Sequence, residues 1–250
     1  MDTLYLIVPC YNEEEALPVS APVFLGKLRE LMEKKMIAPD SRVMFVDDGS
    51  SDGTWDIIKR LHAENVCVDG LRLEKNRGHQ NAVTAGLATA IEDAGVTVTM
   101  AADLQDDISA IDVMAEKYNA GCPIVCGVRR RRDTDSFLKR VTARGYYAVM
   151  NLFGAKVIYD HADFRLLSRE AVERLLGFGT EDLFLRGLIT RLDLPIEKVY
   201  YDRTARNAGE SKYTLRKTLH LARRGMTCGG MKRAETPQIG KLWIAEHLHG

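Results

Sequence analysis

The sequence lacks a net charge, because its 250 residues carry 35 lysines and arginines against 35 aspartates and glutamates. No overall field therefore draws the molecule toward nucleic acid or anionic lipid. It also lacks an apolar run of membrane length, and no basic leader precedes the apolar run near residue 1, so we expect neither a membrane span nor a signal peptide. The five cysteines lack the paired spacing of zinc sites, which predicts reduced thiols in a cytoplasmic protein.

Two glycine-rich motifs are absent as well. No GxGxxG follows the first expected strand and no GxxxxGKS or GxxxxGKT occurs, so neither a dinucleotide fold nor a P-loop is supported. The basic stretch 203–233 has no pattern of stacking aromatics around it, and we expect no nucleic-acid partner.

Short apolar runs alternate with stretches of helical spacing over the first 128 residues. The runs occur at 4–9, 42–46, 71–73, 96–100 and 124–128. Asn12 is expected to cap the first helix, which Pro39 and Asp40 end. The alternation predicts an α/β fold with a doubly wound, mostly parallel sheet and helices on both faces.

Polar residues gather just beyond the ends of these runs. Glu13, Asp47, Asp48, Arg77 and Asp103 come from four separate segments. In an open α/β sheet the carboxyl ends of the strands line one crevice, where ligands bind. If these residues lay on unrelated surface loops, their position just after a strand would be a coincidence in each of the four segments. The sequence therefore predicts a nucleotide site at this edge.

The stretch 97–107, TVTMAADLQDD, is a buried strand that runs into an acidic turn. Asp103 and Gln105 can converge on one divalent cation, and that cation can carry a diphosphate. Taken alone, the stretch favours a solvated acidic turn after a core strand, which is the commoner meaning of such a pattern.

The second half of the chain is more basic. Arginines 129–132 precede a helix expected over 137–152, and they form either a solvated basic face or a surface for an anionic acceptor. Residues 157–167 are expected to form an irregular strand with His161, Asp163 and Arg165. Residues 175–188 are expected to be mostly helical, with Glu181 and Asp182 as ordinary first-turn acids.

A donor-rich loop at 206–213 opens an amphipathic C-terminal helix that reaches about residue 224. Its basic side can lie on an anionic membrane, although a helix docking on its own domain would look similar. Residues 226–250 show no clear period. We predict one domain over 1–225, with a nucleotide-binding half at 1–128 and an acceptor-side half at 129–225, followed by a tail of unknown role.

These motifs resemble the inverting family 2 glycosyltransferases with the GT-A fold, and within them the branch that transfers sugars to polyprenyl phosphates. VPCYNEE at 8–14 and VDDGSSDGT at 46–54 stand where that family has its first two motifs. ADFRL at 162–166 and GESKY at 209–213 match its later ones. The resemblance covers about residues 4–220, and the motifs are jointly specific.

The resemblance implies roles for individual residues. It places the catalytic base at Asp163 and a divalent metal, Mg²⁺ or Mn²⁺, on Asp103 and Gln105. It implies contacts to the nucleotide from Pro9, Tyr11, Glu13, Asp47, Asp48, Arg77, Gln80, Ala102 and Asp103. The diphosphate or the acceptor phosphate is expected to meet Arg129, Arg140, Arg206, Ser211 and Lys212.

The resemblance also implies how Asp163 acts. A single in-line attack on the donor inverts the anomeric centre. If the acceptor is a hydroxyl, Asp163 must remove its proton. A phosphate monoester has a second pKa of about 6 and is already largely ionised, so Asp163 need only orient it.

Ala101 departs from the family, because the DxDxQ motif usually has its first aspartate there. Three functions remain open: transfer to a polyprenyl phosphate, transfer to a saccharide or protein hydroxyl, and sugar-nucleotide binding without turnover. A UDP-sugar is the favoured donor and a GDP-sugar the alternative. We expect a cytoplasmic protein, peripheral at the cytoplasmic face of the membrane; assembly into a homo-oligomer is left open. The absence of QxxRW argues against a processive synthase.

Overall fold

The computed structural model describes residues 1–130, 158, 161–181, 183–203, 230–239 and 242–250. Strand β1 (Leu4–Cys10) runs through the middle of its sheet, and every residue of β1 is buried. It pairs in parallel with β2 (Arg42–Asp47) on one side and with β4 (Val96–Thr99) on the other. A strand covered on both faces needs a continuous apolar run, which is what LYLIVP supplies.

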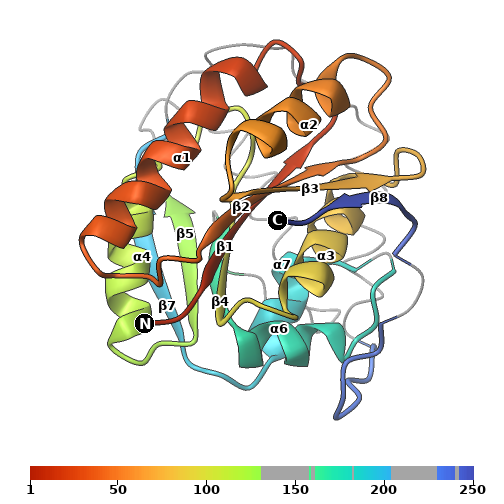
Figure 1. Ribbon diagram of the computed structural model, residues 1–250. Coiled ribbons are helices and arrows are strands. Elements are labelled where there is room, and N and C mark those ends of the chain that lie inside the picture. Colours follow the sequence, from red (N-terminus) through yellow and green to blue (C-terminus); the bar gives the residue numbers. More distant parts are fainter. Residues whose placement is uncertain (131–157, 159–160, 182, 204–229, 240–241) are drawn as a thin grey trace, which may run out of the picture.

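The described sheet has eight strands in the order β7-β5-β6-β4-β1-β2-β3-β8 (Figure 1). Two of them run antiparallel to their neighbours: β6 pairs with β4 and β5, and β8 pairs with β3. The predicted mostly parallel α/β sheet is confirmed. The remaining strands are β3 (Val68–Leu73), β5 (Ile124–Arg129), β6 (His161–Ser168), β7 (Ile196–Tyr201) and β8 (Ile244–Leu248).

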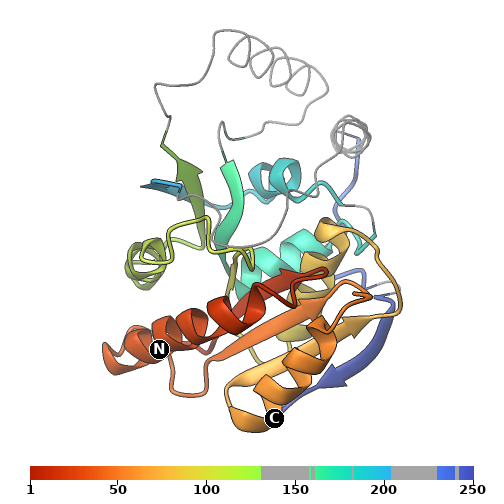
Figure 2. The same ribbon diagram turned by 90° about the horizontal axis from the view of Figure 1, so that it is seen from above.

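Helices cover both faces of the sheet, as predicted (Figure 2). One core contains side chains of α1 (Leu17–Glu33), α2 (Thr54–Glu64) and α4 (Ala110–Asn119). The other core lies against α3, α6 and α7, followed by the 3₁₀ turn η1. The bounds of these elements are His79–Ala90, Arg169–Leu176, Leu185–Leu188 and Ile189–Arg191.

The first helix begins and ends at positions that differ from the prediction. Asn12 does not cap it, because Asn12 has a φ of 52° and its side-chain oxygen accepts a hydrogen bond from Ser51 N at 2.9 Å. The helix ends at Glu33, before Pro39, since Lys35 adopts a φ of 56°. Lys35 N and the following Met36 N then return to the last turn, a geometry that closes a helix without proline.

The region predicted as one helix over 175–188 is broken. Helix α6 ends at Leu176, and Gly179 takes a φ of +99° in the connection to α7. Glu181 lies exposed in that connection, so its assignment to the first turn of a helix is wrong; Asp182 lies outside the described residues. The strand expected to be irregular at 157–167 is β6 over 161–168, and its register with β5 shifts between Cys126 and Val128.

Strand β8 was not expected from the sequence. It lies along β3 at the edge of the sheet (Figure 1), and most of its residues are exposed. The amphipathic helix predicted near 213–224 falls outside the described residues. Within the part of the chain that the structure describes, none of the helices has the length and apolar character needed to cross a bilayer.

Candidate functional site

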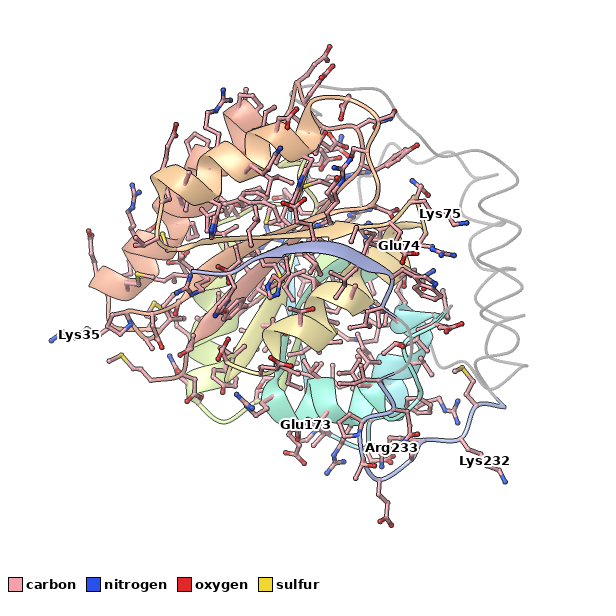
Figure 3. The ribbon with its side chains drawn as sticks, turned by 45° about the vertical axis from the view of Figure 1, so that its right-hand side comes forward. Lys35, Glu74, Lys75, Glu173, Lys232 and Arg233 are labelled. Carbon is pink, nitrogen blue, oxygen red and sulfur yellow. The ribbon has the colours of Figure 1, made fainter. Side chains whose placement is uncertain are left out.

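The residues predicted to line a crevice lie where β1, β2, β3, β4 and β5 end. Because β6 is antiparallel to β4, it begins at the same edge, with His161 opposite Val128 and Arg165 opposite Thr99. The sheet therefore brings the start of β6 to the loops that follow the parallel strands. Glu74 and Lys75, at the end of β3, mark one side of this edge in Figure 3.

The Asp-Asp pair after β2 holds the neighbouring loop. The Asp48 carboxylate accepts hydrogen bonds from Arg77 N at 2.7 Å and from Gly78 N at 2.9 Å. Asp47 is fully buried, and burial raises its pKa, although Ser50 N donates to its Oδ1 at 3.0 Å. The predicted meeting of Asp48 and Arg77 is present in the structure.

The loop after β1 is joined to the loop after β2 by a series of hydrogen bonds. Asn12 N donates to Ser50 Oγ at 2.9 Å, and Glu13 N donates to Thr54 Oγ1 at 2.8 Å. Pro9 is buried within β1 opposite Val46. The predicted nucleotide residues Pro9, Tyr11, Glu13, Asp47, Asp48 and Arg77 thus belong to three interlocked segments.

Asp163 is paired with two arginines at this edge. His161, Asp163 and Arg165 alternate along β6, so they share one face of the strand. The buried Arg165 pairs with Asp163 Oδ1, and Arg186 donates to Oδ2 at 2.7 Å and to Oδ1 at 3.1 Å. Burial would raise the pKa of Asp163, but Arg186 and Arg165 hold this pKa well below its usual range. The carboxylate is therefore ionised at neutral pH.

Arg186 was missed by the sequence analysis. It lies in α7, and the Gln80 side-chain oxygen fixes the start of that helix by accepting from Leu185 N at 3.2 Å. Gln80 was predicted to contact the nucleotide, and here it positions the helix that carries Arg186. The available signal was a single cation inside the apolar run LFLRGLI.

Two histidines flank Asp163. His79 Nε2 lies 3.6 Å from Asp163 Oδ2, and burial lowers the pKa of both His79 and His161. Within the described residues, both ring nitrogens of His161 and two guanidinium nitrogens of Arg165 are buried without a hydrogen-bond partner. Buried polar atoms of this kind are rare, and they mark the inner side of the Asp163 cluster as a polar region of the core.

The acidic stretch after β4 offers few metal ligands. Asp103 Oδ1 accepts from Gln105 N at 3.2 Å, and the side-chain oxygen of Gln105 accepts from Arg203. Among the described residues, no group of three or more histidines, cysteines or acids is arranged to hold a metal. Asp103 and Gln105 therefore fit a hard cation only if water and phosphate oxygens complete its shell, an arrangement common for Mg²⁺.

Asp103 nonetheless lies close to the Asp163 cluster. Its charge contributes to the electrostatic surroundings of His79, the residue next to Gly78 in the Asp48 loop. Ala102, which precedes it, is buried. The loops after β2, β3 and β4 and the start of β6 therefore converge around His79.

Arg129 is held at the end of β5 by a buried acid. Asp106 Oδ1 accepts from Tyr201 OH at 2.6 Å and from Arg129 Nη2 at 3.1 Å. This contact joins the ends of β5 and β7 to the acidic stretch. The other residues predicted to meet phosphate groups, Arg140, Arg206, Ser211 and Lys212, lie outside the described residues.

The fold is that of the GT-A glycosyltransferases, as two solved structures show. Glucosyl-3-phosphoglycerate synthase from Mycobacterium tuberculosis superposes with a TM-score of 0.60 over 99% of this chain and 90% of that one, at 16% identity. Mannosyl-3-phosphoglycerate synthase from Rubrobacter xylanophilus gives 0.57 over 96% and 80%, at 15% identity. At such identities the likeness establishes the fold alone.

The chain belongs to glycosyl transferase family 2, since the profile described as Glycosyl transferase family 2 matches residues 5–176. It is 46% identical over 224 residues to the uncharacterized glycosyltransferase YkoT of Bacillus subtilis, which covers 90% of this chain and 66% of that protein. It is 37% identical over 223 residues to the bactoprenol glucosyl transferase of Shigella phage SfV, covering 89% and 70%. The chain thus spans about two thirds of the length of these relatives.

Proposed function

We propose that this family 2 glycosyltransferase moves a sugar from a nucleoside-diphosphate sugar to a polyprenyl phosphate with inversion. The observation that carries the proposal is Asp163, which two arginines keep ionised at the polar edge of the sheet. The similarity to a protein described as a bactoprenol glucosyl transferase supports the same acceptor class.

A carboxylate with a strongly lowered pKa is a weak proton acceptor. General-base efficiency is greatest when the pKa of the base lies near the working pH. Asp163 is therefore poorly suited to deprotonate a sugar hydroxyl and better suited to fix the positions of Arg165 and Arg186. A phosphate monoester needs no base, because its second pKa is about 6 and its oxygens are already charged. The state of Asp163 thus favours a phosphate acceptor over a hydroxyl.

Cationic side chains at this edge can also stabilise the negative charges of the reaction. Arg186 is partly exposed at the cluster, and Arg129 holds a second cation at the end of β5. Preorganised cations of this kind can orient an anionic acceptor and counter the charge that develops on the departing diphosphate. Arg140, Arg206, Ser211 and Lys212 are proposed to add further phosphate contacts.

A divalent metal is proposed as cofactor. The M. tuberculosis synthase has been crystallised with Mn²⁺ and UDP, which supports a metal and favours UDP as the nucleotide. When bound, the ion would neutralise charge on the diphosphate, and Asp103 and Gln105 are the residues of this chain that would hold it. The remaining ligands would come from water and from the donor.

Attachment to a membrane surface follows from this acceptor, and the cytoplasmic face is proposed for it. A polyprenyl phosphate resides in the bilayer, so the protein must reach the lipid surface to meet it. The basic residues after 203 are proposed to make that contact. Association into a homo-oligomer stays a prediction.

The test is transfer by the purified chain. UDP-glucose and GDP-mannose would each be offered with undecaprenyl phosphate in detergent, with undecaprenol, and with a soluble saccharide acceptor, in Mn²⁺ and in EDTA. The proposal expects a glycolipid product only with the phosphorylated lipid. Product on undecaprenol or on the saccharide at the same rate would overturn the choice of acceptor.

Ala101 favours one second function, nucleotide-sugar binding without turnover. The chain would then bind UDP by calorimetry yet transfer nothing to any acceptor, and Ala101→Asp would gain transfer. Turnover by the wild-type chain rejects this alternative.

A further inference from the structure

Strand β8 reaches the predicted nucleotide site from the far end of the described chain. Its ladder with β3 continues beyond the strand ends, because Glu74 N donates to Trp243 O at 2.8 Å. Trp243 therefore stands directly opposite the first residue of the loop that carries Arg77. Figure 3 shows Glu74 and Lys75 at this end of the ladder.

Trp243 contacts Arg77 through its ring. The Arg77 guanidinium carbon lies 4.4 Å from the centroid of the indole, within the range of a cation–π contact. Glu74 is the acid beside the same guanidinium, at 3.8 Å from Nη2. The guanidinium thus lies between the indole ring and the Glu74 carboxylate, and these two contacts limit its position.

The backbone of Trp243 is strained. Its φ of 54° is one that bulky residues seldom adopt, and such a conformation persists only where surrounding contacts impose it. In this conformation Trp243 makes both the ladder bond to Glu74 and the ring contact with Arg77. Placing an indole under Arg77 therefore costs conformational energy.

A second series of contacts joins β8 to the other acid of the Asp-Asp pair. Glu246 accepts from the Trp55 indole N–H at 3.1 Å, and the Arg72 guanidinium carbon lies 5.8 Å from the Trp55 ring. Arg72 Nε in turn lies 3.3 Å from Asp47 Oδ2. Both Asp47 and Asp48 are therefore connected to β8, Asp48 through the loop of Arg77.

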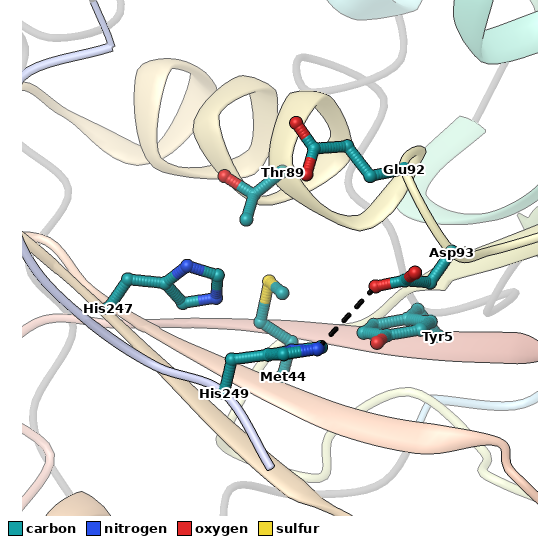
Figure 4. Close-up of a pocket in the computed structure, with 7 residues that line it drawn as sticks. All are labelled: Tyr5, Met44, Thr89, Glu92, Asp93, His247 and His249. Carbon is teal, nitrogen blue, oxygen red and sulfur yellow. Dashed lines mark ion pairs between the residues drawn. The ribbon is translucent and has the colours of Figure 1, made fainter.

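The opposite end of β8 is also fixed. His247 and His249 line a small pocket with Thr89, Glu92 and Asp93 of the α3 region, and with Tyr5 and Met44 of the sheet (Figure 4). His249 lies 3.2 Å from Asp69 and 3.7 Å from Asp93. The strand is thus held at both ends, and Trp243 lies at the end nearer the nucleotide site.

We infer that Trp243 is a positioning residue for nucleotide binding: its indole holds Arg77 in the orientation that grips the nucleoside diphosphate of the donor. The inference rests on the proposed function, because Arg77 must contact the nucleotide. It gives the C-terminal strand a role in donor binding rather than in transfer.

The experiment compares UDP affinity by calorimetry and donor KM and kcat for variants of the whole 250-residue chain. Trp243→Asn removes the ring while keeping a residue that tolerates positive φ. It should weaken UDP binding and raise the donor KM about three- to tenfold, with kcat nearly unchanged. Trp243→Phe retains an aromatic face and should recover most of the affinity. Ile244→Thr, an exposed change that keeps β-branching on the same strand, should match the wild type.

The double variant Trp243→Asn with Arg77→Ala tests whether the indole acts through Arg77. Trp243→Asn should add nothing once Arg77 is absent. Full additivity of the two losses, or unchanged affinity in a folded Trp243→Asn variant, would overturn the inference while leaving the proposed function intact. Unchanged affinity in Arg77→Ala would also overturn it. A wild-type chain that binds neither UDP nor GDP would reject the proposed function and the inference together.

Discussion

Arg186 Nη2 lies 2.7 Å from Asp163 Oδ2, and its Nε lies 3.1 Å from Oδ1, so the guanidinium grips both oxygens of the acid. With Arg165 behind it, one carboxylate serves two cations. Because it pairs with two guanidinium groups, Asp163 stabilises the folded site and is also a candidate for the chemistry. A substitution of Asp163 can therefore change stability as well as activity.

Asp163→Asn should lower the free energy of unfolding by about 3–5 kcal/mol at pH 7, because it leaves the buried Arg165 without its counter-charge. Since the folded-state pKa of Asp163 is lowered, its contribution is complete above the unfolded value of about 3.9 and is lost as pH falls toward the folded value. Urea unfolding of the wild type and the variant at pH 7 and at about pH 2.5 measures the loss of stability and its dependence on pH. Asp202→Asn, which removes an exposed acid paired with Arg130, is the control and should cost less than about 1 kcal/mol.

The rate of transfer to polyprenyl phosphate should fall on the acid side with a midpoint of about 6, the second pKa of the acceptor. Protonation of Asp163 cannot cause this fall in rate, because the pKa of Asp163 lies well below the usual range of a carboxyl group. The measurement is kcat/KM for the lipid between pH 5 and 8. The residual activity of Asp163→Asn should fall with the same midpoint. If the activity of that variant no longer fell at acid pH, the fall would belong to Asp163 and not to the acceptor phosphate.

Ala101→Asp should strengthen metal binding. It adds a second carboxylate two residues before Asp103, and affinity for hard cations rises with the charge of the ligand set. We expect the Mn²⁺ concentration for half-maximal transfer to fall on the order of tenfold. Ala101→Asn matches the size without the charge. Equal effects of the two changes would show that the carboxylate is not a ligand.

Gly49→Ala should loosen the contact between the Asp48 loop and the Arg77 loop. A Cβ at Gly49 would lie 2.4 Å from the carbonyl carbon of Lys75, and the φ of Gly49 is +65°. Gly121→Ala is the matched control, since its φ is +99° and no atom lies within 4 Å of the added Cβ. Gly121→Ala should lower the free energy of unfolding by about 1–3 kcal/mol, which is the conformational cost of alanine at a positive φ.

The two glycine variants are separated by ligand binding. Gly49→Ala should weaken UDP binding in calorimetry, because the added carbon must displace Lys75 and with it the loop of Arg77. Gly121→Ala should bind UDP as the wild type does. Equal affinity in both variants would mean that the position of the Arg77 loop is not set by its contact with Gly49.

Much of the fold could be predicted because buried parallel strands carry a local signal. LYLIVP and the segment VMFV within β2 are apolar throughout, and the polar residues that follow them lie at one edge as expected. Strand direction has no such signal, so the antiparallel course of β6 could not be read from its residues. The family resemblance identified Asp163, whereas its partner Arg186 depends on the break between α6 and α7.

Strand β8 was missed for a physical reason. IAEHL is short and mostly exposed, and it gains its order from pairing with β3 rather than from its own pattern. Contacts such as Tyr201 to Asp106 are equally invisible in the sequence, since they join residues that are 95 positions apart. The predicted domain boundary at 225 and the roles of residues 204–229 stay predictions.

The contact between Trp55 and Glu246 spans 191 residues. Closing so large a loop is entropically unfavourable until most other contacts exist, so the outermost ladder should be among the last parts of the molecule to form. During synthesis, β3 remains an unpaired edge able to accept a strand from another chain. Conditions that delay completion of this ladder should therefore promote aggregation before they affect the finished enzyme.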